Sequence, residues 1–173
     1  MALTAREFWM LFHLGLGVLY VHAFASGLAG LSLGARLRRL NAGTWVMAIT
    51  AWLTVISGTW IVYPWYRAEP PESVANLAAY PKSYLLADPT IAQWHEFGME
   101  WKEHVGWISP ILATAVGYVV IRYGPELTLA REGERQIRKA LIVLFTIAFL
   151  TTVVAAGLGA FINKVAPKIF MDL

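Results

Sequence analysis

The sequence predicts an all-α integral membrane protein: an up-down bundle of four helices with a long extracytoplasmic connection between the second and third. Of its 173 residues, 58% are hydrophobic and only 14% are charged, which is too apolar for a soluble domain of this size. Four apolar runs, at residues 8–33, 45–65, 105–121 and 140–162, approach or exceed the roughly 18–20 residues that cross about 30 Å of hydrocarbon as a helix. None alternates with the period of two that is typical of barrel strands. We therefore interpret residues 1–173 as a single four-span transmembrane domain.

The first two helices have recognisable ends. Thr4 and Glu7 fit a capping box, so the first helix is expected at about 5–33, where Gly34 favours termination. The second is expected at about 44–65, because it runs into a proline and a belt of aromatic residues at 63–66.

The third helix is expected to be longer than the membrane is thick. Asp88 and Pro89 form a good N-cap and first-turn pair, so this helix should run from about 89 to 123, where Gly124 and Pro125 end it. Its roughly 35 residues would measure about 52 Å at 1.5 Å per residue. Only the later part can then lie in the membrane, and the earlier part should project into water or bend at Pro110. The fourth helix is expected at about 138–163.

The distribution of Lys and Arg predicts the orientation, because cytoplasmic loops carry an excess of both. The long segment from 67 to 103 holds Arg67, Lys82 and Lys102 against six acidic residues. The two short connections hold most of the other basic residues: Arg36, Arg38, Arg39, Arg122, Arg131, Arg135, Arg138 and Lys139. We therefore expect a multi-pass protein of the cytoplasmic (inner) membrane, with both termini on the extracytoplasmic side.

Composition excludes some functions. The basic residues are few and lie at span ends, which argues against a nucleic-acid partner. The chain has no cysteine, so thiolate catalysis and cysteine-ligated metal centres are excluded.

Ionisable residues inside a span indicate function, and imidazole is an axial ligand of haem iron. The four histidines are His13 and His22 on the first helix and His95 and His104 on the third. Nine residues at 100° each amount to 900°, which is two full turns and a half turn, so the two histidines of each helix lie on opposite faces. This spacing favours one bis-histidine site over two stacked ones.

His104 is the expected inward ligand of the third helix. Depth in the membrane favours His13 as its partner, and the small residues around His22 favour that histidine instead, so both stay open. His95 should lie above the membrane, where it would be solvated or would ligate a metal at a peripheral site. The alternative for all four is a structural one, in which they hydrogen-bond lipid headgroups or neighbouring helices.

Charged residues near these histidines suggest two further roles. Glu100 and Glu103 lie on an acidic stripe of the third helix and are candidates for proton exchange. Arg67 and Lys102 could pair with haem propionates. A solvated acidic face with Lys102 as its counter-charge is the alternative.

Four helices, histidines on two of them, and aromatic and basic residues on one side resemble the small membrane-bound b-type cytochromes. The resemblance is one of architecture over the whole chain and includes no specific sequence motif. It implies haem b as a cofactor, with quinone as a further ligand. The sequence departs from the members that stack two haems, because their histidines share one face of a helix.

We therefore expect an integral membrane haem-b electron-transfer protein or subunit, linked to quinol, and leave open whether it is itself an enzyme. The alternative is a cofactor-free accessory subunit of a larger respiratory or photosynthetic complex, whose helices hold lipid, quinone or (bacterio)chlorophyll. Either would have membrane lipid and other membrane subunits, or a quinol or cytochrome partner, as its neighbours.

Overall fold

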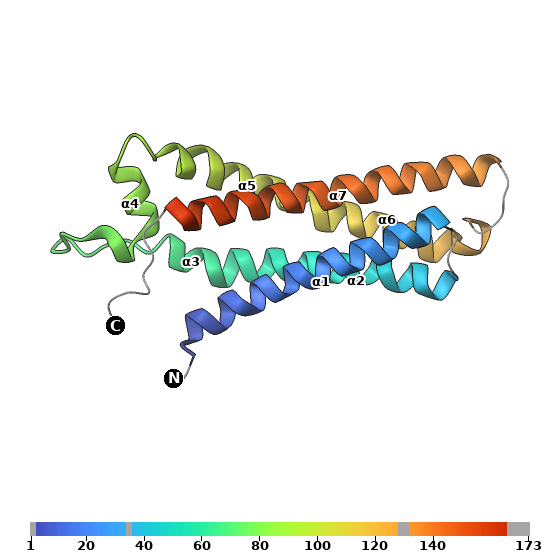
Figure 1. Cartoon of the computed structure of the whole chain (residues 1–173), viewed down its shortest axis with the longest axis horizontal. Coiled ribbons are helices and arrows are strands. Elements are labelled where there is room, and N and C mark those ends of the chain that lie inside the picture. The colour runs from blue at the N-terminus through green and yellow to red at the C-terminus, as the bar shows by residue number, and fades with distance from the viewer. Residues whose placement is uncertain (1–2, 34–35, 128–131, 166–173) are drawn as a thin grey trace.

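The computed structural model describes residues 3–33, 36–127 and 132–165, with side chains described for 133–162 of the last range. These residues are helical or lie in turns and connections, and none of them forms a strand. Within them, four helices are long and apolar enough to cross a membrane: Ala5–Leu33, Leu37–Tyr66, Trp94–Leu127 and Gly133–Ile162. They run alternately in opposite directions (Figure 1), as the sequence predicts.

The first span is the single helix α1 (Ala5–Leu33), with the bounds that the sequence predicts. Its first turn is closed by the capping box. The Thr4 backbone N–H donates to Glu7 Oε2 at 2.8 Å, and the Glu7 N–H donates back to Thr4 Oγ1 at 3.3 Å.

The second span contains α2 (Leu37–Ser57), the π-helix η1 (Gly58–Val62) and α3 (Tyr63–Tyr66). It begins about seven residues before the expected start near 44. Arg38 and Arg39 are good helix formers whose long side chains can reach water from a helix end, so the helix continues past the hydrocarbon boundary.

The third span is interrupted. It contains the π-helix η3 (Trp94–Met99), α5 (Glu100–Val105) and α6 (Ile108–Leu127), with a turn at Gly106 and Trp107. The break lies just before Pro110, whose ring would clash with the carbonyl four residues earlier, that of Gly106. The expected bend is therefore present, but about one turn earlier than the proline. The helix also continues past 123 to Leu127, because a proline close to a helix end removes few hydrogen bonds.

The fourth span, α7 (Glu132–Val165), starts about six residues before the expected 138. The connection between the second and third spans carries the 3-10 helix η2 (Leu77–Ala79) and the helix α4 (Pro81–Ala87). The first residue of α1, the last turn of α7 and this connection all lie at one end of the bundle (Figure 1). We name this the terminal end, and the opposite one the loop end.

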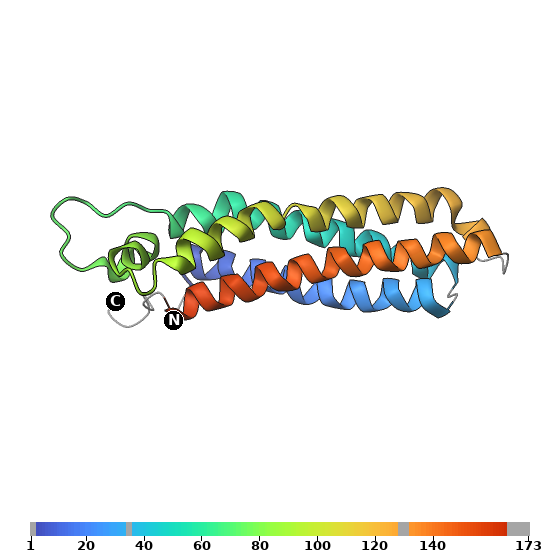
Figure 2. The same cartoon turned by 90° about the horizontal axis from the view of Figure 1, so that it is seen from above.

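Neighbouring spans pack in sequence around the bundle: α1 against α2, α2 against α6, α6 against α7, and α7 against α1. α1 and α6 therefore lie across the bundle from each other (Figures 1 and 2). The tightest crossing joins α1 and α2, where a Cβ atom on Gly43 would lie 2.6 Å from the backbone nitrogen of Gly27. Such a close approach of two backbones requires glycine.

Candidate functional site

The side chain of His95 lies against Tyr66 at the terminal end. Its Nδ1 atom is hydrogen-bonded with the Tyr66 hydroxyl at 2.8 Å, and only 8% of the residue is exposed. The expectation of a solvated His95 is therefore wrong. η3 packs against α7 with His95, Gly98 and Met99 buried. The half-turn between the two histidines of this span holds, but His95 faces inward and His104 is exposed.

His13 reaches across from α1 to the second span. Its Nδ1 atom is 2.9 Å from the Ser57 hydroxyl, which itself lies 3.2 Å from the Thr54 carbonyl oxygen. The Ser57 hydroxyl has one proton, so it either donates to the Thr54 carbonyl and accepts from His13 Nδ1, or donates to His13 Nδ1, depending on the imidazole tautomer. Gly58 gives the ring its space, because a Cβ atom there would lie 3.1 Å from His13 Cε1.

Lys102 extends from α5 towards α7 at the same level. A Cβ atom on Gly159 would lie 3.1 Å from the Lys102 ammonium, so only glycine leaves room for it. His13 and Glu103 are the charged or ionisable neighbours that act on Lys102 electrostatically. The ammonium group is therefore directed into the bundle and not towards water.

Tyr63 and Glu103 add two polar atoms to this group. The Tyr63 hydroxyl and Glu103 Oε1 are both buried without a hydrogen bond of good geometry among the described residues. They are neighbours of each other, because the Glu103 side chain acts on the phenol through a hydrogen-bonding and an electrostatic interaction. The Tyr63 ring stacks on Tyr66 with centroids 6.1 Å apart, and the Arg67 guanidinium lies 5.3 Å from its centroid. Arg67 thus covers an aromatic ring.

These residues (His13, Ser57, Tyr63, Tyr66, His95, Lys102 and Glu103) are hereafter the polar cluster. An apolar group of Leu85, Met99 and Ile162 covers it, packed against the tyrosine rings. Leu85 comes from α4 and is fully buried, so the connection acts as a cover that separates the cluster from solvent. Electrostatic interactions are stronger in such a water-poor setting.

Both hydrogen bonds of the polar cluster lie next to a π-helix. η1 begins directly after Ser57, and η3 contains His95. π-helices are rare and occur frequently at functional sites, where the extra residue in a turn redirects side chains. Two of them in adjacent spans, at the same end of the bundle, mark this region as the candidate site.

The other two histidines are directed outward. His104 Nδ1 is 2.7 Å from the Glu100 carbonyl oxygen, and His22 Nδ1 is 2.9 Å from that of Val18, each in its own helix. His104 follows Lys102 by two residues, or about 200° around a helix, and therefore faces away from the cluster. Glu100 is also exposed. Of the two acidic candidates, Glu103 has a buried carboxylate oxygen at the cluster, whereas the exposed Glu100 acts on His95 and Tyr63 only electrostatically.

The inward histidines do not fit the two axial positions of one haem. Their partners Ser57 and Tyr66 are nine residues apart in one span, about 13 Å along a helix at 1.5 Å per residue. Two imidazoles on one metal ion lie within about 4 Å of each other, because each metal–nitrogen bond is about 2 Å. Among the described residues, no group of three or more His, Asp or Glu side chains could hold a metal ion. Ligation by His104 with His13 or His22 stays a prediction.

Sequence reasoning missed Ser57 and Tyr66 as partners of the inward histidines. Tyr63 and Tyr66 are typical of an aromatic belt at a membrane interface, and one helical turn separates them. Ser57 has no distinguishing sequence signal, since serine is common within apolar helices. Which hydroxyl meets which imidazole depends on how the spans are packed.

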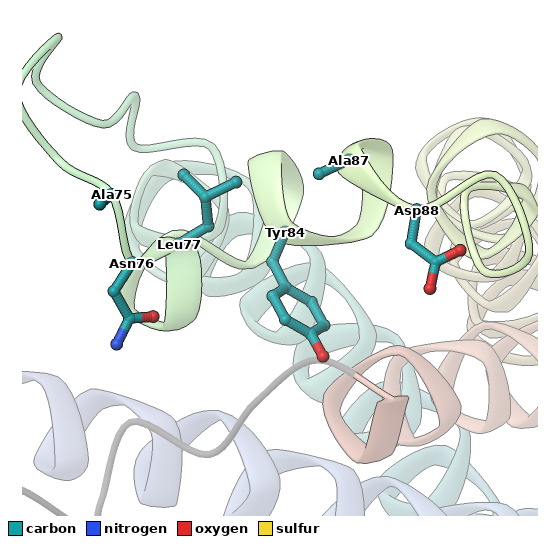
Figure 3. Close-up of a pocket in the computed structure, with 6 residues that line it drawn as sticks. All are labelled: Ala75, Asn76, Leu77, Tyr84, Ala87 and Asp88. Carbon is teal, nitrogen blue, oxygen red and sulfur yellow. The ribbon is translucent and has the colours of Figure 1, made fainter.

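The connection has its own electrostatic features outside the spans. Lys82 forms an ion pair with Glu69, with Nζ 2.7 Å from Oε1, and holds the pKa of that carboxyl below its usual value. Hydrogen bonds from the side chain and backbone of Thr90 lower the pKa of Asp88 in the same way. A surface pocket of about 430 Å³ opens beside them, with Tyr84 and Asp88 on its walls (Figure 3). Asp88 caps the following turn through Thr90, so its place on the pocket wall has a structural reason.

The fold and the cluster together define a class: a helical protein with four candidate membrane spans and a buried polar site at one end of the bundle. Comparison of the chain with protein-family models, with curated proteins and with solved structures found no match.

Proposed function

We propose that this chain is a membrane electron-transfer protein or subunit that is linked to quinol, with the polar cluster as its site of proton exchange. The observation that carries the proposal is the partly buried hydrogen bond between Tyr66 and His95, near the carboxylate of Glu103. Buried imidazole, phenol and carboxylate groups are retained where they act on a substrate or a proton.

The chemistry requires both proton and electron acceptors. Oxidation of a quinol to a quinone releases two electrons and two protons. The inward imidazole of His95 and the carboxylate of Glu103 would take up the protons, and the phenol of Tyr66 would orient the imidazole. The electrons need a one-electron acceptor such as haem b. The protein's part is to hold the quinol hydroxyls near these groups and to exclude bulk water.

Haem b enters this proposal through the outward histidines. His104 and His22 each hold Nδ1 against a carbonyl of their own helix, which is the arrangement that orients an imidazole ligand. Both side chains are exposed, so a haem on either would lie between this chain and a neighbouring one. When bound, the haem would supply one-electron transfer.

The side of the membrane follows from charge. At the loop end lie Arg36, Arg38, Arg39, Arg135, Arg138 and Lys139. The connection at the terminal end carries Glu69, Glu72 and Asp88 with only Arg67 and Lys82. We propose that the loop end faces the cytoplasm and that the polar cluster lies near the extracytoplasmic face of the inner membrane.

The test combines a spectrum with a rate. The full chain, purified with any subunits that accompany it, is examined by pyridine haemochrome assay and by reduced-minus-oxidised spectroscopy after addition of quinol. His95→Phe and Glu103→Gln should slow quinol-driven reduction by about 10²-fold, the usual contribution of a positioned acid or base. Glu96→Gln is the matched control, since Glu96 neighbours His95 on η3 but is exposed.

Three outcomes decide the proposal. Absence of any quinol-driven reduction, alone or with its subunits, would overturn it. Equal rates for Glu103→Gln and Glu96→Gln would remove the polar cluster from the reaction. A b-type spectrum that persists unchanged in both His104→Ala and His22→Ala would exclude these residues as haem ligands.

The second candidate is an accessory subunit of a larger membrane complex, without a redox centre of its own. The outward placement of His22 and His104 favours it, because an imidazole exposed within a span needs a polar partner from outside the chain. Copurification in a large complex, with no quinol-dependent spectral change assigned to this chain, would support this candidate over the first.

A further inference from the structure

The interior of the bundle repeats in layers seven residues apart. The first layer contains His13, Ser57, Lys102 and Gly159, one residue from each span. A step of seven residues towards the loop end turns a continuous helix by almost two full turns and advances it about 10 Å, so in α1, α2 and α7 it returns to the same face. In the third span the same step crosses the turn at Gly106 and Trp107, and the contact of Ser109 with Tyr20 places Ser109 in the next layer. The second layer is therefore Tyr20, Thr50, Ser109 and Thr152, all of them hydroxyl-bearing.

Hydrogen bonds join three of the four residues of the second layer, Tyr20, Ser109 and Thr152. The Tyr20 hydroxyl is 2.8 Å from Ser109 Oγ and donates to the Ala148 carbonyl at 2.8 Å. Either hydroxyl can be the donor in the hydrogen bond between Tyr20 and Ser109. Thr152 is a further hydrogen-bonding neighbour of Tyr20, and Thr50 is buried on the α2 side. Tyr20 and Ser109 are each 1% exposed.

The third layer, another seven residues on, is apolar. It contains Gly27, Gly43, Val116 and Phe145. The backbones of Gly27 and Gly43 touch, Phe145 lies 2.7 Å from where a Cβ atom on Gly27 would be, and both Val116 and Phe145 are fully buried. None of these four residues has a polar side chain, so the layer itself does not continue the series of hydroxyl groups.

We propose that the polar layers form a hydrated half-path for protons, which begins at Tyr66 and His95, passes the layer of His13 and Lys102, and ends at Tyr20. The end of the path follows from chemistry. A proton can pass through an imidazole, which accepts at Nε2 and releases at Nδ1, and through a hydroxyl, but the Ala148 carbonyl that accepts from Tyr20 has no proton to pass on.

Water is needed between the layers, because about 10 Å separates them and a hydrogen bond spans about 3 Å. Tyr63 Oη and Glu103 Oε1, which are buried and lack a hydrogen bond of good geometry, lie where such water would begin and bridge them. On α7 the small residue Ala155 lies between the two layers and is partly buried. The path would connect the proposed proton-exchange site with the middle of the membrane.

Cysteine accessibility tests this directly, since the chain has no native cysteine. Single variants Ser57→Cys, Ser109→Cys and Val116→Cys place one thiol in each of the three layers. Each full-length variant is reconstituted in vesicles and exposed to silver ions, which are about the size of water, in chloride-free buffer. The remaining free thiols are counted with a maleimide after denaturation.

The expected result is fast reaction at Ser57→Cys and Ser109→Cys. Reaction at Val116→Cys should be at least about tenfold slower, because the thiolate is the reactive form and apolar burial raises a thiol pKa by a unit or more. Tyr118→Cys, on the exposed and lipid-facing side of α6, should also be slow. Thr152→Cys reports the second layer from α7 if Ser109→Cys fails to fold.

Equal and slow reaction at Ser109→Cys, Thr152→Cys and Val116→Cys would overturn the half-path. Fast reaction at all three layers would equally overturn its closed end. The half-path rests on the proposed function, because proton exchange is what it would serve. Its test is independent, because thiol reactivity depends on neither quinol nor haem. Slow thiols with normal quinol activity would therefore refute the half-path alone, and fast thiols without quinol activity would refute the proposed function alone.

Discussion

The hydroxyl of Tyr66 and the Nδ1 atom of His95 lie 2.8 Å apart, although 29 positions separate them in the sequence. This contact joins the end of the second span to the beginning of the third, beneath the connection that links them. It also gives a buried imidazole the partner that burial demands, since an unpaired polar group in such a place is costly.

The first prediction concerns this contact. Tyr66→Phe keeps the ring stacking on Tyr63 and removes only the hydroxyl, which leaves His95 Nδ1 buried without a partner. We expect the free energy of unfolding to fall by about 1–3 kcal/mol. Thermal unfolding of the purified protein in detergent measures this. Tyr84→Phe, on the surface of α4, is the control and should change little; equal melting temperatures for the two variants would contradict the assignment.

Tyr20 is the hydroxyl that ties three spans together. Tyr20→Phe removes the hydrogen bond to Ser109 Oγ and one of those that the Ala148 carbonyl accepts, so it should also lower the free energy of unfolding by about 1–3 kcal/mol. The Ala148 carbonyl keeps its bonds from Thr151 and Thr152. Ser109→Ala removes one bond and should cost less, about 0.5–1.5 kcal/mol. Tyr118→Phe, at an exposed position, is the matched control. A Tyr20→Phe variant with the same melting temperature as the wild type would show that these hydrogen bonds contribute no stability.

Two glycines, one in the contact between α1 and α2 and one with open space around it, test how these helices pack. Gly43→Ala places a methyl group 2.6 Å from the Gly27 nitrogen, so the two backbones must separate and the melting temperature should drop. Gly15→Ala meets nothing within 4 Å and should be neutral or stabilise by up to about 1 kcal/mol through helix propensity. The reverse order of stabilities would refute this crossing.

The pair of Glu69 and Lys82 should make the connection sensitive to acid. Because the pKa of Glu69 is lowered in the folded state, the stabilisation is fully present above the ordinary glutamate pKa of about 4.3 and is lost as the pH falls through the lowered value. Protection factors for backbone hydrogen exchange, from which the intrinsic pH dependence of exchange is divided out, should therefore fall in residues 67–90 between pH 6 and pH 3. Glu69→Gln should reduce this fall to the part that Asp88 contributes, and an unchanged pH response in that variant would assign it elsewhere.

Particular elements show where sequence reasoning was sufficient. The capping box of Thr4 and Glu7 is a local pattern, and α1 begins there as predicted. The bend before Pro110 follows from the geometry of one residue. The ends of α2, α6 and α7 extend beyond the predicted bounds, because hydropathy marks where the membrane begins and not where a helix ends.

The candidate site shows where sequence reasoning was not sufficient. The half-turn between His95 and His104 is a property of the helix and can be counted from the sequence. The inward histidine is His95, because η3 packs on α7 through Gly98 and Met99, and a rotation of the whole helix by half a turn would have satisfied the same count.

The sequence by itself determined four apolar spans, their alternating directions and the separation of the histidines onto opposite faces, because each depends on local composition and helix period. Only the tertiary structure decided that Tyr66 meets His95, that Ser57 meets His13 and that hydroxyl groups form a layer around Tyr20. These contacts depend on the rotation and the relative height of packed helices. Both are set by how the helices fit together, for example where the backbones of Gly27 and Gly43 come into contact.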